Sequence, residues 1–293
     1  GATARLGVEA GGKRVTLEAG RLAATVAPQQ NPFRINTPQA IAEVVGTQFS
    51  LSVAGETTRL DVEKGGVRLT LGHDTSAAVL VEGGWSAVAR PGRLSAPTRR
   101  TFLTDPSVFP IGVWLQDPAL AEEYKAAGIN IFMNLWEGPT EKQLAALEAA
   151  GLRTVCGRND VAAQARWRGT IAGWTVAAWP DIAQQRGQDG WAPPITPKAV
   201  IERYRALRSA DSALPAVLIL SQGVAWDGWV GRGVRTNHPE DYPEYVKGCD
   251  IAAFQIFPAN AREAEIAGQI WLVHHGVKRL CEWTGGVKPV WTF

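Results

Sequence analysis

The sequence lacks long hydrophobic runs and an excess of charge of one sign. No apolar segment approaches the roughly 20 residues that a membrane-spanning helix requires, so we expect no membrane span. The 30 lysines and arginines nearly balance the 28 aspartates and glutamates, which argues against a nucleic acid as partner. Only three cysteines are present, without the spacing of a disulfide framework or a metal site, so no metal is expected.

Several cofactor and catalytic motifs are also absent. No glycine-rich dinucleotide fingerprint follows a predicted strand, and no phosphate loop or Ser-His-Asp arrangement appears. We therefore expect no cofactor, and a cofactor-dependent oxidoreductase is the least favoured function. Tryptophan, in contrast, is abundant: the chain has 12, against 4 tyrosines and 1 methionine, and all but Trp85 follow residue 110.

Residues 1–90 have the pattern of an all-β domain, a sandwich or roll. Short apolar or alternating runs such as 22–26, 49–53 and 67–71 recur between glycines and prolines, and no helical period of useful length interrupts them. Residues 91–108 mix proline, serine, threonine and arginine without periodicity, so we expect a linker there.

Residues 109–293 alternate between predicted strands and predicted helices. Such repeated units imply a parallel sheet that closes as a TIM-type α/β barrel. Only seven of the eight strands of such a barrel are found, so we expect a truncated barrel that either more chain or a neighbouring subunit completes. The predicted strands are 111–115, 129–135, 152–155, 171–176, 217–220, 251–256 and 289–291, and the predicted helices are 118–127, 140–150, 198–210 and 261–282.

Three segments of the first domain carry a family resemblance. They are Thr37-Pro38-Gln39-Ala40, then Val45-Gly46-Thr47-Gln48-Phe49, and the turn Val62-Glu63-Lys64-Gly65-Gly66-Val67. Over about residues 10–90 the chain resembles the FecR-like domain, with its first strands missing before Gly1. The resemblance implies a β module of a bacterial envelope protein, and hence an extracellular or periplasmic location.

The second domain resembles glycoside-hydrolase-like (β/α)₈ barrels of the retaining clan, on segments 109–114, 128–130, 136–138, 223–229 and 237–242. The resemblance implies an acid/base glutamate after strand 4 and a nucleophilic glutamate after strand 7. Here Ala178 and Trp179 stand where the acidic pair is expected, and Phe293 ends the chain before the nucleophile's position.

Four carboxylates remain at the ends of predicted strands. Glu137, Asp160, Asp181 and Asp227 follow strands 2 to 5, where a barrel places its active site. Glu137, Asp181 and Asp227 are the weak catalytic candidates, and helix capping or turn formation explains each of them equally well or better. No catalytic residue is assigned.

Aromatic and amide side chains at the strand ends fit a carbohydrate better than the acids do. Tryptophan offers a flat apolar face to the C–H face of a sugar, and amides bond hydroxyl groups. About half of the tryptophans are instead expected to fill the interior or a domain interface. The predicted substrate-binding residues are Trp114, Asn134, Trp136, Trp179, Gln222, Trp226, Trp229, His238, Gln255 and Trp291.

Two functions remain in competition. The first is an exported carbohydrate-active protein in which the barrel acts on or binds a glycan. The second is a non-catalytic structural, assembly or glycan-binding protein of the cell envelope with a degenerate barrel. In the second case a second copy of the chain or another envelope protein covers the open barrel edge, because exposed strand edges favour association.

Overall fold

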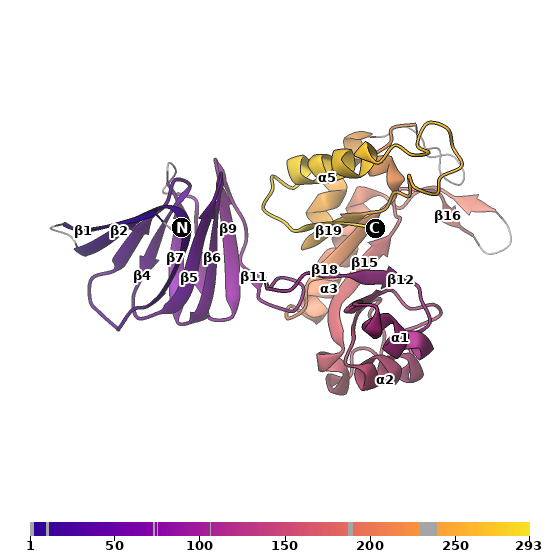
Figure 1. Ribbon diagram of the computed structural model, residues 1–293, viewed down its shortest axis with the longest axis horizontal. Helices are drawn as coiled ribbons and strands as arrows, with labels where there is room; N and C mark the ends of the chain where they lie inside the picture. The colour runs from indigo at the N-terminus through magenta and orange to yellow at the C-terminus, as the bar shows by residue number, and fades with distance from the viewer. Residues whose placement is uncertain are drawn as a thin grey trace. The chain divides into compact units, whose positions relative to one another are not determined.

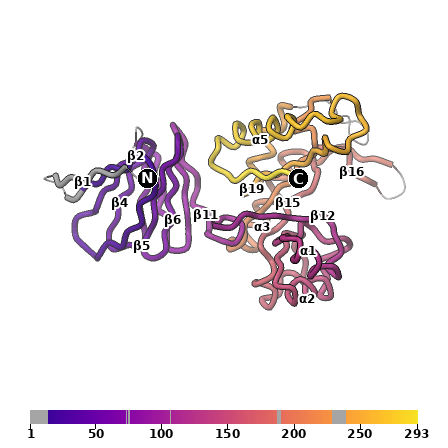
Figure 2. Tube along the Cα trace, in the orientation of Figure 1, coloured from indigo at the N-terminus to yellow at the C-terminus, as the bar shows by residue number. Residues whose placement is uncertain are grey.

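The structure is a computed structural model and forms two compact units, Gly1–Arg100 and Thr101–Phe293 (Figures 1 and 2). Part of the predicted linker 91–108 is strand: β10 (Arg93–Leu94) and β11 (Thr98–Arg99) pair with β9 (Trp85–Arg90). The residues described are 3–9, 12–72, 74, 76–105, 107–186, 190–228 and 239–293.

The first unit is a nearly closed, mixed β barrel, which confirms the all-β prediction. Its strand order is β10-β9-β6-β5-β2-β3-β4-β7-β8, with β1 beside β2 and β11 beside β9. Strands β2 and β3 are parallel and the other pairs are antiparallel. The remaining bounds are β1 Thr3–Glu9, β2 Gly12–Thr25, β3 Phe33–Asn36, β4 Ala40–Val44, β5 Gln48–Ala54, β6 Thr57–Lys64, β7 Gly66–Leu71 and β8 Ala78–Glu82.

The residues of the FecR-like segments build turns of this barrel. The Thr37 hydroxyl accepts the Ala40 N–H at 2.9 Å, and the Thr47 hydroxyl donates to the Gly66 carbonyl at 3.0 Å. Gly65 has a φ of +87°, and a Cβ there would lie 2.8 Å from the Gly46 carbonyl oxygen. Only glycine fits that position.

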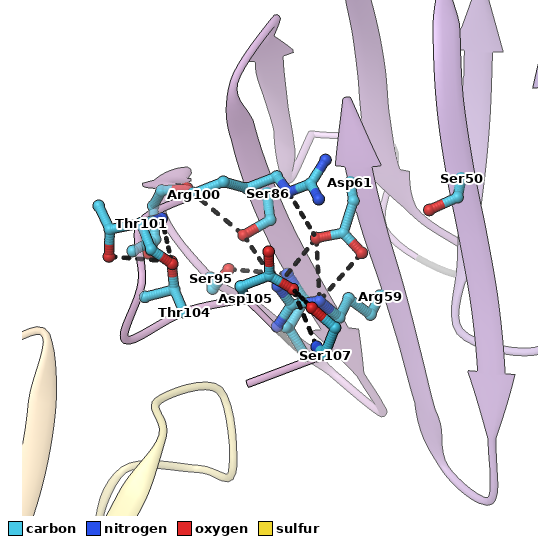
Figure 3. Close-up of polar contacts among 12 residues, drawn as sticks. Ser50, Arg59, Asp61, Ser86, Ser95, Arg100, Thr101, Thr104, Asp105 and Ser107 are labelled. Carbon is cyan, nitrogen blue, oxygen red and sulfur yellow. Dashed lines mark hydrogen bonds and ion pairs between the residues drawn. The ribbon is translucent and has the colours of Figure 1, made fainter. Parts of the chain in front are cut away.

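A charged cluster connects β6 with the residue that follows β11 (Figure 3). Asp61 is 5% exposed and accepts from Arg59 Nε at 3.0 Å and Nη2 at 2.8 Å. Arg100, in the predicted linker, lies 4.0 Å from the same carboxylate. The two arginines compensate the buried charge, as a buried carboxylate requires.

The second unit is a partial α/β barrel with seven parallel strands, as predicted. Their order in the sheet is their order in the chain. The strands are β12 Gly112–Trp114, β13 Ile131–Met133, β14 Arg153–Cys156, β15 Ile171–Ala178, β18 Ala216–Leu220, β19 Ile251–Phe254 and β20 Val290–Thr292. A hairpin that the sequence analysis missed joins β16 (Gln184–Gln185) and β17 (Trp191–Ala192).

Helices cover the outer face of this sheet, with bounds close to prediction except at α5. The predicted helix 261–282 begins only at residue 271, after turns that include Gly268 at φ +74°. The α-helices are α1 Ala121–Ala126, α2 Glu141–Ala150, α3 Pro197–Ala210, α4 Tyr242–Tyr245 and α5 Trp271–Trp283. The 3₁₀ helices are η1 Pro118–Leu120, η2 Ala165–Gly169, η3 Gln222–Val224, η4 Pro239–Asp241 and η5 Val246–Gly248.

Local signals explain several of these helices. Thr140 and Gln143 form a reciprocal capping box at the start of α2, and Gly151 ends it at a φ of 67°. On α5, a Cβ on Gly276 would lie 2.3 Å from the Phe254 ring, so glycine lets this helix approach β19. No helix in the described ranges is long and apolar enough to cross a membrane.

Two cysteines are part of the core. Cys156 and Cys249 are fully buried, and burial raises the pKa of each thiol to about 12. Both therefore pack as small apolar side chains, whereas Cys281 is only partly buried.

Candidate functional site

The inner face of the partial barrel is aliphatic along its middle and aromatic at the carboxyl ends of its strands. Leu103 belongs to the inner cluster and packs near the starts of the strands. It lies close to the backbone of β15, since a Cβ on Gly173 would lie 3.0 Å from the Leu103 side chain. Trp114, Trp179, Trp291 and Phe293 lie at the other end, and we call these four residues the aromatic mouth. This is the end at which α/β barrels place their ligands.

The aromatic mouth is held by ring contacts. The ring centroids of Trp114 and Trp179 lie 5.4 Å apart at an interplanar angle of 38°. Trp114 also meets Phe293 edge-on, at 5.8 Å and 66°. Such pairs contribute about 0.5–1.5 kcal/mol beyond their buried area, so Trp114 links the first strand to the last one.

A pocket of about 300 Å³ opens beside this cluster, between the two edge strands β12 and β20. Its lining is almost wholly apolar, with Thr292 as the polar residue. Gly112 keeps it open, because a Cβ there would lie 3.0 Å from the Ile131 side chain. The lining residues are Pro110, Gly112, Trp114, Ile131, Met133, Phe257, Trp291, Thr292 and Phe293.

Three strands end in a left-handed, non-glycine residue. These are Leu115 (φ 51°), Asn134 (φ 57°) and Trp179 (φ 53°). Each still donates its N–H to the neighbouring strand, to Met133, Val155 and Ile219 respectively. The conformation costs about 1–2 kcal/mol for an L-residue, and strain of this kind is concentrated at binding and catalytic sites.

A β-bulge sets which side chains of β15 face the barrel interior. Thr175 pairs with Val217 and Ala177 with Leu218, so Val176 is an extra residue. Val176 and Ala177 consequently both pack outward, and Ala178 joins the inner cluster. Bulges re-aim side chains in this way. Ala178 therefore places only a methyl group at this inner position.

A polar pair joins the end of β13 to β15. The Thr175 hydroxyl donates to Asn134 Oδ1 at 2.7 Å, which orients the amide. The indole N–H of Trp179 is buried and has no hydrogen-bond partner among the described residues. Buried polar groups are rarely left without a partner, so this N–H is available to a ligand or a water molecule.

Asp181 is buried at the end of β15. It is 1% exposed, and its carboxylate accepts the Ser221 N–H at 3.0 Å, the Ser221 hydroxyl at 2.6 Å and the Tyr242 hydroxyl at 3.0 Å. Burial raises the pKa of Asp181, and these hydrogen bonds oppose the rise. The arrangement ties the end of β15 to the end of β18.

Asp227 is paired instead with a cation. Its oxygens accept from Arg279 Nη1 at 2.7 Å and Nη2 at 3.0 Å, and these hydrogen bonds hold its pKa below the usual value. Arg279 also donates to the Val224 carbonyl. The pair fastens α5 to the turn that follows β18.

The structure distributes the other predicted residues over several places. Glu137, Asp160 and Trp136 are exposed, with Trp136 at 67%. Gln222 begins η3 and Gln255 follows β19, both partly buried, and Trp226 packs against the outer cluster with α5. Trp229 and His238 lie outside the described residues.

Sequence reasoning missed several residues of this region. Phe257 and Phe293 line the pocket but were not among the predicted residues, because the prediction considered tryptophan and not phenylalanine as a sugar-stacking side chain. Thr292 and Thr175 were missed because a threonine in a strand is ordinarily only a strand former. For Thr175 the alternation of β15 was an available signal, because it puts Thr175 on the same face as Gly173, which faces Leu103 of the inner cluster. Within the described ranges no three His, Cys, Asp or Glu side chains gather as a metal site would need.

Comparison with known proteins finds a family match at the N-terminus. The family described as FecR protein matches residues 3–68, so a FecR domain lies in the first unit. No curated protein sequence matches the chain. A structure assigned as an anti-sigma factor from Parabacteroides distasonis is 14% identical, with 51% of this chain and 79% of that chain covered and a TM-score of 0.30.

Two solved glycosidases are similar in structure at low identity. A GH2 β-galacturonidase from Eisenbergiella tayi is 11% identical, with 99% of this chain and 55% of that chain covered and a TM-score of 0.40. The Ruminococcus gnavus β-glucuronidase is 10% identical, with 83% and 52% covered and a TM-score of 0.43. The chain thus spans about half the length of the glycosidases that it matches.

Proposed function

We propose that the second unit binds a carbohydrate at the aromatic mouth without hydrolysing it, as part of an exported cell-envelope protein. The observation that carries the proposal is the apolar pocket of about 300 Å³ between β12 and β20, with Trp114, Trp291 and Phe293 in its wall. The pocket runs along β12 from Pro110 to Trp114 and reaches Phe293 after β20, so one end of it lies at the carboxyl ends of the strands, where such barrels bind ligands. The envelope location rests on the resemblance of the first unit to FecR-like domains.

The chemistry of the pocket suits a sugar ring. Indole faces offer flat apolar surface to the C–H face of a pyranose. Thr292 in the lining, and the Asn134 amide and Trp179 N–H at the ends of β13 and β15, are polar groups suited to ring hydroxyl groups. Few polar groups in a mostly apolar pocket are typical of small-molecule sites.

The described carboxylates do not support hydrolysis. Retention of configuration requires two carboxyl groups about 5–5.5 Å apart, and no carboxylate lines the pocket in the described ranges. Asp181 is internally bonded, Asp227 is paired with Arg279, and Glu137 is exposed. Binding without turnover is therefore the function that this geometry supports best.

The test is a glycan-binding screen with a matched pair of tryptophan variants. Trp291→Ala removes a pocket wall, whereas Trp136→Ala removes an exposed ring outside the lining. For a glycan retained by the unaltered chain in affinity electrophoresis, Trp291→Ala should weaken binding about 30-fold, as for a buried aromatic anchor. Trp136→Ala should leave it unchanged. Equal effects of both variants, or retention of no glycan, would contradict the proposal.

A second candidate function is assembly through the barrel edges. In the described residues β12 and β20 each pair on one side only, so their outer backbone groups are open to a further strand. We propose that a second copy of the chain covers this edge. Light scattering during gel filtration should then show a dimer that Thr292→Pro weakens, since proline removes an edge N–H. A monomer at all concentrations would contradict this candidate.

A further inference from the structure

We propose that the pocket beside the aromatic mouth selects a neutral glycoside that carries a short aliphatic chain on its sugar. This inference rests on the proposed function, because it names the class of glycan that the same pocket binds. The pocket has a volume of about 300 Å³ and lies between the edge strands β12 and β20. The order, the size and the chemistry of its lining favour a ligand with an apolar part next to the sugar ring.

The lining residues along β12 divide the pocket into an aromatic part and an aliphatic part. Trp114, at the carboxyl end of the strand, meets the Phe293 ring at 5.8 Å. Gly112, two residues earlier, pairs with Ile131 and faces the same side as Trp114, because alternate residues of a strand share a face. Pro110 lines the pocket before the strand begins. We call Pro110, Gly112 and Ile131 the aliphatic end of the pocket.

The volume of the pocket exceeds what one six-membered ring requires. An apolar cavity of about 150 Å³ is large enough to bind a benzene ring. The volume of this pocket, about 300 Å³, is about twice as large. A sugar ring that stacks on the aromatic part therefore leaves the aliphatic end for a second group on the same ligand.

The chemistry of the aliphatic end determines what this second group is. Its three residues have no polar side-chain atom, and no charged residue in the described part of the chain lines the pocket. A second sugar ring would bring hydroxyl groups that find no side-chain partner there, and a charged group would lose hydration without gaining a counter-charge. Methylene groups have no such cost, and each one that leaves water strengthens binding about fourfold. The second group is therefore a short alkyl or acyl chain.

Gly112 sets the width of the aliphatic end. A Cβ at this position would lie 3.0 Å from Ile131 Cγ2 and 3.2 Å from Met133 Cγ. The φ of Gly112 is not positive, so its backbone conformation is one that alanine also adopts. The space that glycine leaves, rather than its conformational freedom, is the property that matters at this residue. Gly112→Ala therefore narrows the aliphatic end without straining the backbone of β12.

The test compares glycosides that differ only in the length of their aliphatic chain. The probes are the methyl, butyl and hexyl glycosides of glucose, galactose and mannose, and calorimetry with the full chain measures each affinity. For the sugar that binds best, the hexyl glycoside should bind at least about tenfold more tightly than the methyl glycoside, with the butyl glycoside between them. Hexyl glucuronide should bind at least about tenfold more weakly than hexyl glucoside, because its carboxylate loses hydration in the pocket.

The outcomes separate this inference from the proposed function. Equal affinities of the methyl and hexyl glycosides, or of the glucoside and the glucuronide, would overturn the inference and leave the proposed function standing. Binding of hexan-1-ol as tight as that of the hexyl glycosides would overturn both, because the sugar would then contribute nothing. If none of the glycosides binds, the inference fails, and the glycan screen decides the proposed function separately.

Three variants locate the aliphatic chain within the pocket. Gly112→Ala should reduce the preference for the hexyl over the methyl glycoside about tenfold, because the added methyl group takes the space of the chain. Gly169→Ala is the matched control and should leave the preference unchanged, since a Cβ there meets no atom within 4 Å. Trp291→Ala should weaken the binding of both glycosides by a similar factor, because the ring stacks on the sugar. An unchanged preference in Gly112→Ala, with thermal melting to verify its folding, would overturn the inference, whereas unchanged affinities in Trp291→Ala would contradict the proposed function.

Discussion

Asp181 and Asp227 both follow strands of the partial barrel, and the protein satisfies them in opposite ways. Asp181 is 1% exposed and is bound by three neutral donors of Ser221 and Tyr242. The Asp227 side chain is 61% exposed and is bound by the two terminal nitrogens of Arg279. From the sequence alone both are simply an aspartate after a predicted strand.

The comparison shows that the surroundings of a carboxylate determine the direction in which its pKa shifts. Burial dominates at Asp181 and raises its pKa, whereas the hydrogen bonds from Arg279 dominate at Asp227 and lower its pKa. A raised pKa is typical of a general acid. The carboxylate oxygens of Asp181, however, accept hydrogen bonds from Ser221 and Tyr242 inside the protein. Asp181 therefore stabilises the strand ends rather than supplying a proton.

The largest effect should come from removing the buried carboxylate. Asp181→Ala removes the acceptor of three hydrogen bonds, which come from the Ser221 N–H, the Ser221 hydroxyl and the Tyr242 hydroxyl. It should lower the free energy of unfolding of the second unit by about 3 kcal/mol. Urea unfolding monitored by tryptophan fluorescence measures the loss. Asp160→Ala, at an exposed aspartate after β14, is the control and should change stability by less than about 0.5 kcal/mol. A loss below about 1 kcal/mol at Asp181 would contradict this account.

The pH dependence of stability should differ in sign between the two aspartates. Above its unfolded pKa near 3.8, Asp181 is ionised in the unfolded chain but retains its proton when folded, so its contribution to stability falls as the pH rises toward the folded pKa. The contribution of Asp227 is present above pH 3.8 and is lost as the pH falls below it. Each slope is at most about 1.4 kcal/mol per pH unit.

Measuring the free energy of unfolding of the unaltered chain, Asp181→Asn and Asp227→Asn between pH 3 and 8 isolates the two contributions. The difference between the unaltered chain and Asp181→Asn should shrink as the pH rises above 4. The difference in the free energy of unfolding between the unaltered chain and Asp227→Asn should shrink as the pH falls below 4. If the two differences in the free energy of unfolding changed with pH in the same direction, one of the two carboxylates would not be in the environment described.

Much of the fold could be predicted because burial repeats with the period of each element. The seven strands of the second unit are short apolar runs between helical segments, and each was expected within a few residues of its observed bounds. The end of α3 at Ala210 and the capped start of α2 follow from propensity and capping residues. Local chemistry therefore determines these elements.

The geometry of the candidate site could not be predicted, because it depends on exceptions to local chemistry. Leu115 and Trp179 adopt left-handed backbone conformations for which neither residue type has a preference. The bulge at Val176 depends on pairing with Val217 and Leu218, some forty residues away in the chain. Tertiary contacts impose both features, so the choice of inward-facing side chains at the end of β15 is visible only in the structure.

A smaller effect is expected from removing one hydrogen bond to Asp181. Tyr242→Phe deletes the hydroxyl but keeps the ring that stacks on Trp283 at 5.3 Å and 7°. Because the Ser221 donors remain, the free energy of unfolding should fall by about 1 kcal/mol, the net value of one such bond. Chemical denaturation of both proteins checks this. A loss as large as that of Asp181→Ala would mean that the tyrosine hydroxyl alone supports the carboxylate.

The smallest loss of stability should come from breaking the ion pair between Asp227 and Arg279. Asp227→Ala should cost about 0.5 kcal/mol, since partly exposed ion pairs are screened by solvent and lose side-chain freedom. Arg279→Gln should cost more, because it also removes the hydrogen bond to the Val224 carbonyl. Raising the salt concentration to 1 M should abolish most of the Asp227 effect and little of the Asp181 effect. If Asp227→Ala lowered the free energy of unfolding as much as Asp181→Ala does, with the same dependence on salt, the contrast between a buried and an exposed carboxylate would not hold for this barrel.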